Sequence, residues 1–83
     1  MGLDLVDLVY RIEDEFEITI PDEAAGLMTT PQMVIDYVSS RPEVKWPRDH
    51  VEATVWLAIV DELGISKEDF NNDSRFIEDM GAG

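Results

Sequence analysis

Few side chains in this sequence are of types, or at spacings, that perform catalysis. The only histidine, His50, follows Asp49 at the expected start of a helix, where the positive end of the helix dipole disfavours a charged imidazole ring. The sequence contains no cysteine, no glycine-rich phosphate-binding loop and no cluster of histidine and carboxylates with metal-ligand spacing. We therefore expect no catalytic residue and no metal site, and we predict that the protein is not an enzyme.

A polar segment near the C-terminus has part of the spacing of a calcium-binding loop. Asp69, Asn71 and Asp73 match the first three ligand positions of such a loop. However, Ser74 stands where the loop needs glycine, and Met80 stands where it needs a bidentate glutamate. Ser74 also completes the only Asp-Ser pair of the chain, and we interpret its hydroxyl as a loop or cap group rather than a modification site.

Acidic side chains far outnumber basic ones. The 83 residues include 19 Asp and Glu but only 6 Lys and Arg, which gives a formal net charge of −13. This charge makes nucleic acid an unsuitable partner, because a phosphate backbone is bound by clustered Lys and Arg. It favours basic protein surfaces as partners, since opposite charge speeds encounter. The competing interpretation is that the acidity only keeps a small domain soluble.

The acidic residues near the N-terminus fall on an expected amphipathic helix over residues 3–16. Its apolar positions recur at three- and four-residue steps: Leu5, Val6, Leu8, Val9, Ile12 and Phe16. Asp4 and Asp7 lie in its first turns, where carboxylates complement the helix dipole. Pro21 predicts an extended link after this helix, and we expect residues 22–26 to form a short helical turn that the glycine ends.

Two further helices have clear boundary signals. Thr30 and Pro31 predict the start of a helix that ends near residue 40, with a buried stripe of Met33, Val34, Tyr37 and Val38. In the longest helix we expect Asp49 as the N-cap with Glu52 completing a capping box, and Gly64 as a left-handed C-cap. Its expected buried face consists of Val51, Val55, Ala58, Ile59 and Leu63.

The remaining segments connect and cover these helices. Residues 41–49 contain two prolines and read as a linker, from which Trp46 is expected to fold back onto the bundle. After the longest helix we expect a single turn at residues 66–69 that carries Phe70, a polar loop over residues 71–74, and two apolar anchors, Phe76 and Ile77.

These elements predict an all-α fold, a small four-helix bundle that forms a single domain over residues 1–83. No apolar run approaches the roughly 18 residues that span a bilayer, so we expect no membrane insertion. The N-terminus has no basic region of the signal-peptide type, and the chain has no cysteine, which together favour a cytoplasmic location.

The helices and loops of this sequence resemble those of the acyl carrier protein family, but they follow one another in a rotated order along the chain. Residues 51–64 are similar to the first helix of the family, and residues 65–83, which end in F-I-E-D-M-G-A-G, resemble the loop that leads to its modified serine. Residues 3–16 resemble the second helix, I-P-D-E at residues 20–23 resembles the link, and residues 29–38 resemble the last helix. The resemblance implies a circular permutation with the family's helices in the order II, III, IV and then I. Residues 1–40 would supply helices II to IV, residues 41–49 a linker without a counterpart, and residues 50–83 helix I with its loop.

The serine to which the family attaches 4'-phosphopantetheine is missing from this resemblance. An ungapped alignment puts Gly2 in its place, with Gly83 in place of the aspartate before it. If the N-terminal loop is aligned instead, Leu5 takes the serine's place. Neither glycine nor leucine offers a hydroxyl nucleophile, so we expect no 4'-phosphopantetheine and no other cofactor.

The resemblance also implies a docking surface, because the family's second helix presents carboxylates to basic patches on partner enzymes. The matching positions here are Leu3, Asp4, Asp7, Tyr10, Glu13 and Asp14. The competing interpretations are that these are ordinary solvated residues, and that Tyr10 packs against the linker and Trp46. The resemblance implies a docking or regulatory partner of acyl- or pantetheine-handling enzymes, of the fatty acid or polyketide type. The alternative is a functional acyl carrier that is modified at a non-standard site or in trans. We expect a monomer, with a dimer that exchanges residues 1–40 as the alternative.

Overall fold

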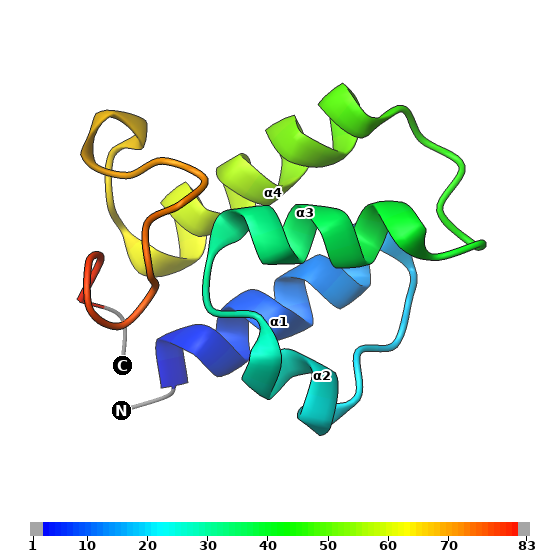
Figure 1. The fold of residues 1–83 in the computed structure, drawn as a ribbon, viewed down its shortest axis with the longest axis horizontal. Helices are drawn as coiled ribbons and strands as arrows, with labels where there is room; N and C mark the ends of the chain where they lie inside the picture. Colours follow the sequence, from blue (N-terminus) through cyan, green and yellow to red (C-terminus); the bar gives the residue numbers. More distant parts are fainter. Residues whose placement is uncertain (1–2, 82–83) are drawn as a thin grey trace.

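Helix α1 (Leu3–Phe16) spans the range that the apolar spacing of the N-terminal segment predicts. In the computed structural model it is followed by α2 (Asp22–Leu27), α3 (Pro31–Ser40), α4 (Arg48–Leu63) and a 3-10 turn at Lys67–Asp69, as Figure 1 shows. The structure describes residues 3–81, with side chains from residue 5 onward, and this part of the chain contains no strand. For these residues the prediction of an all-α fold with four helices is confirmed.

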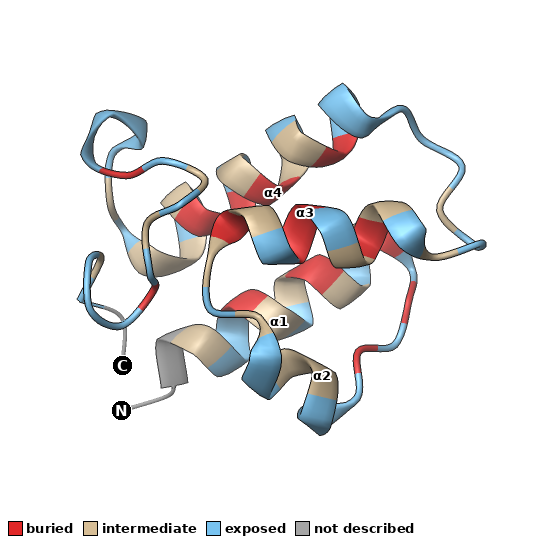
Figure 2. Cartoon of the chain, in the orientation of Figure 1, coloured by how far each residue is buried: buried red, intermediate tan, exposed pale blue. Residues whose placement is uncertain are grey.

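The core lies where α1 and α3 both pack against α4 (Figure 1). Figure 2 shows that the buried residues of these three helices face one another, whereas α2 contributes no buried residue. The buried apolar side chains of the three helices are Leu8, Ile12 and Phe16 in α1, Val34, Ile35 and Val38 in α3, and Val51, Val55, Ala58 and Ile59 in α4. Their three- and four-residue spacing places them on one face of each helix. The sequence pattern predicts all of these residues in α1 and α4, but Val6 of the predicted α1 stripe is exposed and Leu63 of the predicted α4 face is only half-buried.

The buried stripe of α3 differs from the predicted one. Ile35 is buried, whereas Met33 is exposed and Tyr37 is only half-buried. The buried face consists of Pro31, Val34, Ile35 and Val38. Apolar side chains flank Val34 on both sides in the sequence, so periodicity alone does not show which side faces the core.

The helix boundaries follow three of the sequence signals and depart from a fourth. The Thr30 hydroxyl accepts a hydrogen bond from the backbone N–H of Met33 at 3.3 Å, and Gly64 ends α4 in the left-handed region at φ 68°, both as predicted. α3 also ends at Ser40, as expected. However, α4 begins one residue before Asp49, which therefore lies in the first turn and does not cap the helix. Pro47 precedes this helix with φ −60°, a value that already suits helical entry.

Two smaller expectations are also corrected. Gly26 does not end α2, because the helix continues through Leu27 and closes when the Met28 N–H donates to the carbonyl of Ala25. Ile77 is not an apolar anchor, since it is exposed, whereas Phe76 is buried as predicted. Phe70 is buried as well, next to the 3-10 turn that the sequence places there.

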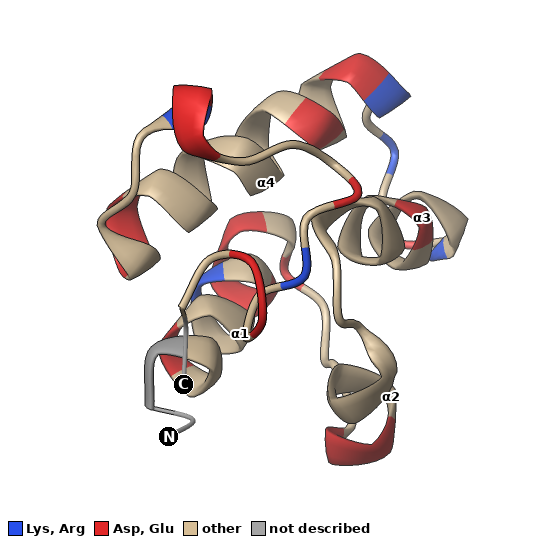
Figure 3. Cartoon of the chain, turned by 60° about the vertical axis from the view of Figure 1, so that its left-hand side comes forward, with Lys and Arg blue, Asp and Glu red and all other residues tan. Residues whose placement is uncertain are grey.

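The C-terminal segment is fastened to the start of α3 by backbone hydrogen bonds. The Gln32 N–H donates to the carbonyl of Asn72 at 3.0 Å, and the Phe76 N–H donates to the carbonyl of Thr29 at 2.9 Å. Figures 1 and 3 both place this segment on the same side of the molecule as the first turns of α1. None of the helices in residues 3–81 has the length and apolar character needed to cross a membrane.

Candidate docking surface on helix α1

The outward face of α1 presents three of the residues that the resemblance assigns to docking. Asp7, Tyr10 and Asp14 are exposed and lie three or four residues apart, so their side chains share one side of the helix. The Tyr10 side chain is 61% exposed. Among the residues that the structure describes, none of the three takes part in a side-chain hydrogen bond or ion pair, so this face is free to meet a partner. Figure 3 shows the acidic positions along α1.

Glu13 also belongs to the predicted docking residues, but its side chain forms a hydrogen bond within the fold. Its Oε2 accepts a hydrogen bond at 2.7 Å from the backbone N–H of Ile20, whose side chain is buried. A carboxylate that accepts from a backbone N–H forms one of the stronger hydrogen bonds of proteins. Glu13 therefore holds the link between α1 and α2 in place, which the sequence does not reveal because the contact depends on how the link folds back.

The remaining predicted positions lie at the edge of what the structure describes. Leu3 and Asp4 belong to the first turn of α1, but their side chains, like Gly2 and Gly83 entirely, lie outside the described part. Leu5, the alternative match to the serine, is half-buried and packs against the core. It lines an apolar pocket of about 210 Å³ together with Met28 and Phe76.

Arg11 connects α1 with the acidic end of α4. Its guanidinium contacts Glu15 Oε2 at 2.8 Å, Asp61 Oδ2 at 3.2 Å and Glu62 Oε2 at 3.2 Å. The hydrogen bond with Glu15 is the main reason why the pKa of Arg11 lies above its ordinary value, and the bonds to Asp61 and Glu62 act in the same direction. One cation thus ties α1 to α4. Of these contacts, only the four-residue spacing of Arg11 and Glu15 is visible in the sequence.

The turn that follows α1 has a feature that the sequence analysis missed. Glu17 has φ 55°, in the left-handed region that glycine usually occupies at this position, and the Ile18 N–H donates to the carbonyl of Glu13 at 3.2 Å. The sequence offers no glycine here as a signal. The turn is instead set by the buried side chains on either side of it, Phe16 and Ile18.

Tyr10 does not pack against the linker in the way that the competing interpretation supposes. Trp46 folds back as expected, but its ring meets Phe16 at a centroid distance of 5.4 Å and His50 at 4.4 Å. His50 therefore packs edge-on against an aromatic ring at the start of α4.

The polar loop after Phe70 is built from local hydrogen bonds. Asn71 Oδ1 accepts from the Asp73 N–H at 2.8 Å, and the Ser74 hydroxyl accepts from the Asn71 N–H at 2.9 Å, which confirms Ser74 as a loop hydroxyl. Over the range that the structure describes, no three His, Asp or Glu side chains gather as a metal ion would require.

Comparisons with known proteins do not assign the chain to a family. No protein-family model matches it, and no solved structure matches it. The likeness to acyl carrier proteins and the permuted helix order stay predictions from the sequence.

Proposed function

We propose that this protein is an acyl-carrier-like docking module that binds acyl- or pantetheine-handling enzymes without itself carrying an acyl group. The observation that carries the proposal is the outward face of α1, where Asp7, Tyr10 and Asp14 are exposed. The net charge of −13 supports it, because a basic patch on an enzyme would be attracted to this face. The permuted carrier arrangement, in which α1 to α4 would correspond to the family's helices II, III, IV and I, is part of the same proposal.

The module would act as a decoy, a regulator or a scaffold subunit. It would offer the enzyme the acidic helix by which a carrier is recognised, and the positions that match the attachment serine would supply no nucleophile. Glu13 would contribute less than its position suggests, since one of its oxygens already accepts from Ile20.

Binding to a β-ketoacyl synthase and to a broad-specificity phosphopantetheinyl transferase tests the proposal. We expect the double variant Asp7→Lys/Asp14→Lys to lose at least about tenfold in affinity, because it reverses both carboxylates that a basic patch would meet. Affinity should also fall as salt concentration rises. The matched control is Asp69→Lys/Asp73→Lys, which makes the same charge change on exposed residues of the C-terminal loop. Equal loss in the two variants would show that net charge, and not the face of α1, governs binding.

The alternative function is a true carrier that is modified at a non-standard residue or in trans. The apolar pocket beside Leu5 favours it, since that pocket lies at the start of α1, next to the positions that match the attachment site. Intact mass after incubation with coenzyme A and the transferase tests the alternative directly. A mass increase of one phosphopantetheine would establish a carrier, and an unchanged mass would favour the docking module.

A further inference from the structure

Helix α4 carries apolar side chains on the face turned away from the core as well as on its inner face. The outer stripe consists of Ala53, Trp56, Leu57 and Val60, at three- and four-residue steps. Leu57 is 55% exposed, Ala53 is exposed, and Trp56 and Val60 are half-buried. Trp56 and Val60 pack partly against the core from this side, but Ala53 and Leu57 do not, so the stripe keeps an exposed apolar surface. Exposed apolar surface of this kind is typical of sites where another protein binds.

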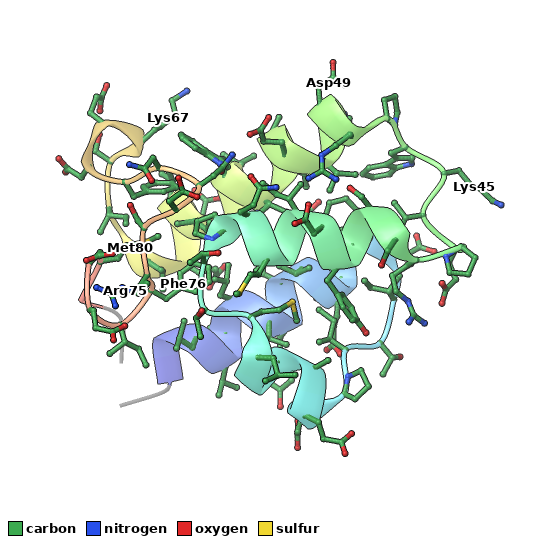
Figure 4. All side chains as sticks on the ribbon, viewed as in Figure 1. Lys45, Asp49, Lys67, Arg75, Phe76 and Met80 are labelled. Atoms are coloured by element: carbon green, nitrogen blue, oxygen red, sulfur yellow. The ribbon has the colours of Figure 1, made fainter. Side chains whose placement is uncertain are left out.

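The outer stripe forms the floor of a surface groove of about 530 Å³. Asp49 and Glu52 line it near the start of α4, and Lys67 of the 3-10 turn lines it beyond the other end of the stripe. Figure 4 labels Asp49 and Lys67, which lie far apart with α4 running between them. From Asp49 to Val60 the part of the groove that α4 lines extends about 17 Å along the helix axis, about the length of three helical turns.

The side chains of the groove are held in position by hydrogen bonds and ring packing. The Trp56 ring lies 4.6 Å from the ring of Phe70, and its Nε1 donates to Asn72 Oδ1 at 2.6 Å. Asn72 Nδ2 in turn donates to Glu52 Oε2 at 2.7 Å. The backbone carbonyl of Asn72 also accepts from Gln32, which connects the groove wall to α3. A site whose side chains are fixed before binding loses less conformational entropy when it is occupied.

We propose that this groove binds an amphipathic helix of a basic partner protein, oriented antiparallel to α4. In that orientation the last turn of the bound helix lies over Asp49 and Glu52, and its first turn lies over Lys67. Helices favour basic residues in the last turn and acidic residues in the first, so the usual charge distribution of a helix matches the groove at both ends. A large apolar side chain of the partner fits beside Ala53, the smallest residue of the floor, as a knob enters a hole.

A second copy of the same chain does not suit this groove. Helix α4 has no basic residue in its last turn and carries Asp61 and Glu62 there. Antiparallel pairing of two α4 helices would therefore bring these carboxylates toward Asp49 and Glu52 of the other copy. Each copy also adds a net charge of −13, so electrostatics favours a basic partner instead. This surface is distinct from the face of α1, and the inference does not rest on the proposed function.

A designed peptide of about 18 residues serves as the probe, with leucines on one helical face, glutamates in its first turn and lysines in its last. The reference peptide has the same composition in scrambled order, so it keeps the charge but lacks the apolar face. In the Trp46→Phe background Trp56 is the single tryptophan and its fluorescence reports the groove. We expect the amphipathic peptide to shift this fluorescence and to bind about tenfold or more tightly than the scrambled one.

Two leucine variants complete the test. Leu57→Glu, at an exposed position, is expected to fold normally and to weaken binding of the amphipathic peptide about tenfold or more, whereas Leu27→Glu on α2, where the side chain is 76% exposed, leaves it unchanged. Circular dichroism of both variants verifies the fold. Equal binding of the two peptides, equal effects of the two variants, or an unresponsive Trp56 would overturn the inference.

Discussion

At the residue scale, the backbone of Glu17 gives a direct test of how α1 ends. A non-glycine residue in the left-handed region costs about 1–2 kcal/mol, part of which a glycine recovers despite its greater entropy when unfolded. Glu17 has φ 55°, so Glu17→Gly is expected to raise the free energy of unfolding by about 0.5–1 kcal/mol in urea titrations. The matched control is Gly64→Ala at φ 68°, where no atom obstructs the new methyl group and the strain alone should cost about 1 kcal/mol. A destabilised Glu17→Gly would contradict this account of the turn.

Glu13 and Asp14 are neighbours on α1 with different predicted roles. Glu13→Ala leaves the Ile20 N–H without its carboxylate acceptor, so we expect a loss of about 1–3 kcal/mol in the free energy of unfolding. Asp14→Ala removes an exposed side chain and should change it by less than about 0.5 kcal/mol. Chemical denaturation measures both. If the two substitutions cost the same, the contact between Glu13 and the link does not contribute as described.

At the element scale, the contact between α3 and α4 can be tested by titrating the carboxyl group of Asp36. Arg48 at the start of α4 donates to Asp36 of α3, and this bond, aided by one from Gln32, holds the pKa of Asp36 below its ordinary value of 3.8. A lowered pKa in the folded state means that the pair stabilises the fold above the ordinary pKa and that this contribution is lost as the pH falls through the folded value. An NMR titration of the Asp36 carboxyl carbon should show the low midpoint, which Arg48→Gln raises toward 3.8. Arg41→Gln is the control, because Arg41 pairs with Glu43 instead, and an Asp36 midpoint that ignores Arg48 would refute the pairing.

The elements differ in how far the sequence predicts them. The ranges of α1 and α3, the Thr30 cap and the Gly64 stop follow from apolar spacing and capping residues, which are local properties. The sequence analysis missed the start of α4, where both Pro47 and Asp49 can begin a helix, and the end of α2, which continues past Gly26 to Leu27. The outer stripe of α4 has a visible signal, namely that Ala53, Leu57 and Val60 are apolar on the face opposite Val55 and Ile59.

Contacts between segments that are distant in the sequence could not be predicted from local sequence patterns. The hydrogen bond from Ile20 to Glu13 and the Asn72 contacts with Trp56 and Glu52 form only once the link and the C-terminal segment fold against the helices. Of the candidate docking residues, the sequence identifies the exposed members Asp7, Tyr10 and Asp14, but it does not show that Glu13 is partly used within the fold.

At the scale of the whole molecule, the net charge of −13 acts over the entire structure. The principal extents are 31 × 26 × 18 Å, so at about 0.01 M salt, where the Debye length is about 30 Å, all of the charges interact. Sodium chloride at about 1 M shortens that length to about 3 Å and relieves the self-repulsion. We therefore expect the melting temperature to rise with sodium chloride in calorimetry. A fall would mean that the ion pairs of Arg11 and Arg48 outweigh the repulsion.

The central claim has two parts: carrier-handling enzymes recognise the protein as a carrier, and the protein does not accept phosphopantetheine. A competition assay tests both parts at once. A genuine acyl carrier protein is modified by a broad-specificity phosphopantetheinyl transferase with coenzyme A, in the presence of rising amounts of this protein, and the intact mass of both chains is followed. We predict that modification of the genuine carrier slows, that this protein keeps its mass, and that Asp7→Lys/Asp14→Lys slows the reaction much less. A mass increase in this protein by one phosphopantetheine, or an unaffected rate of carrier modification, would contradict the account.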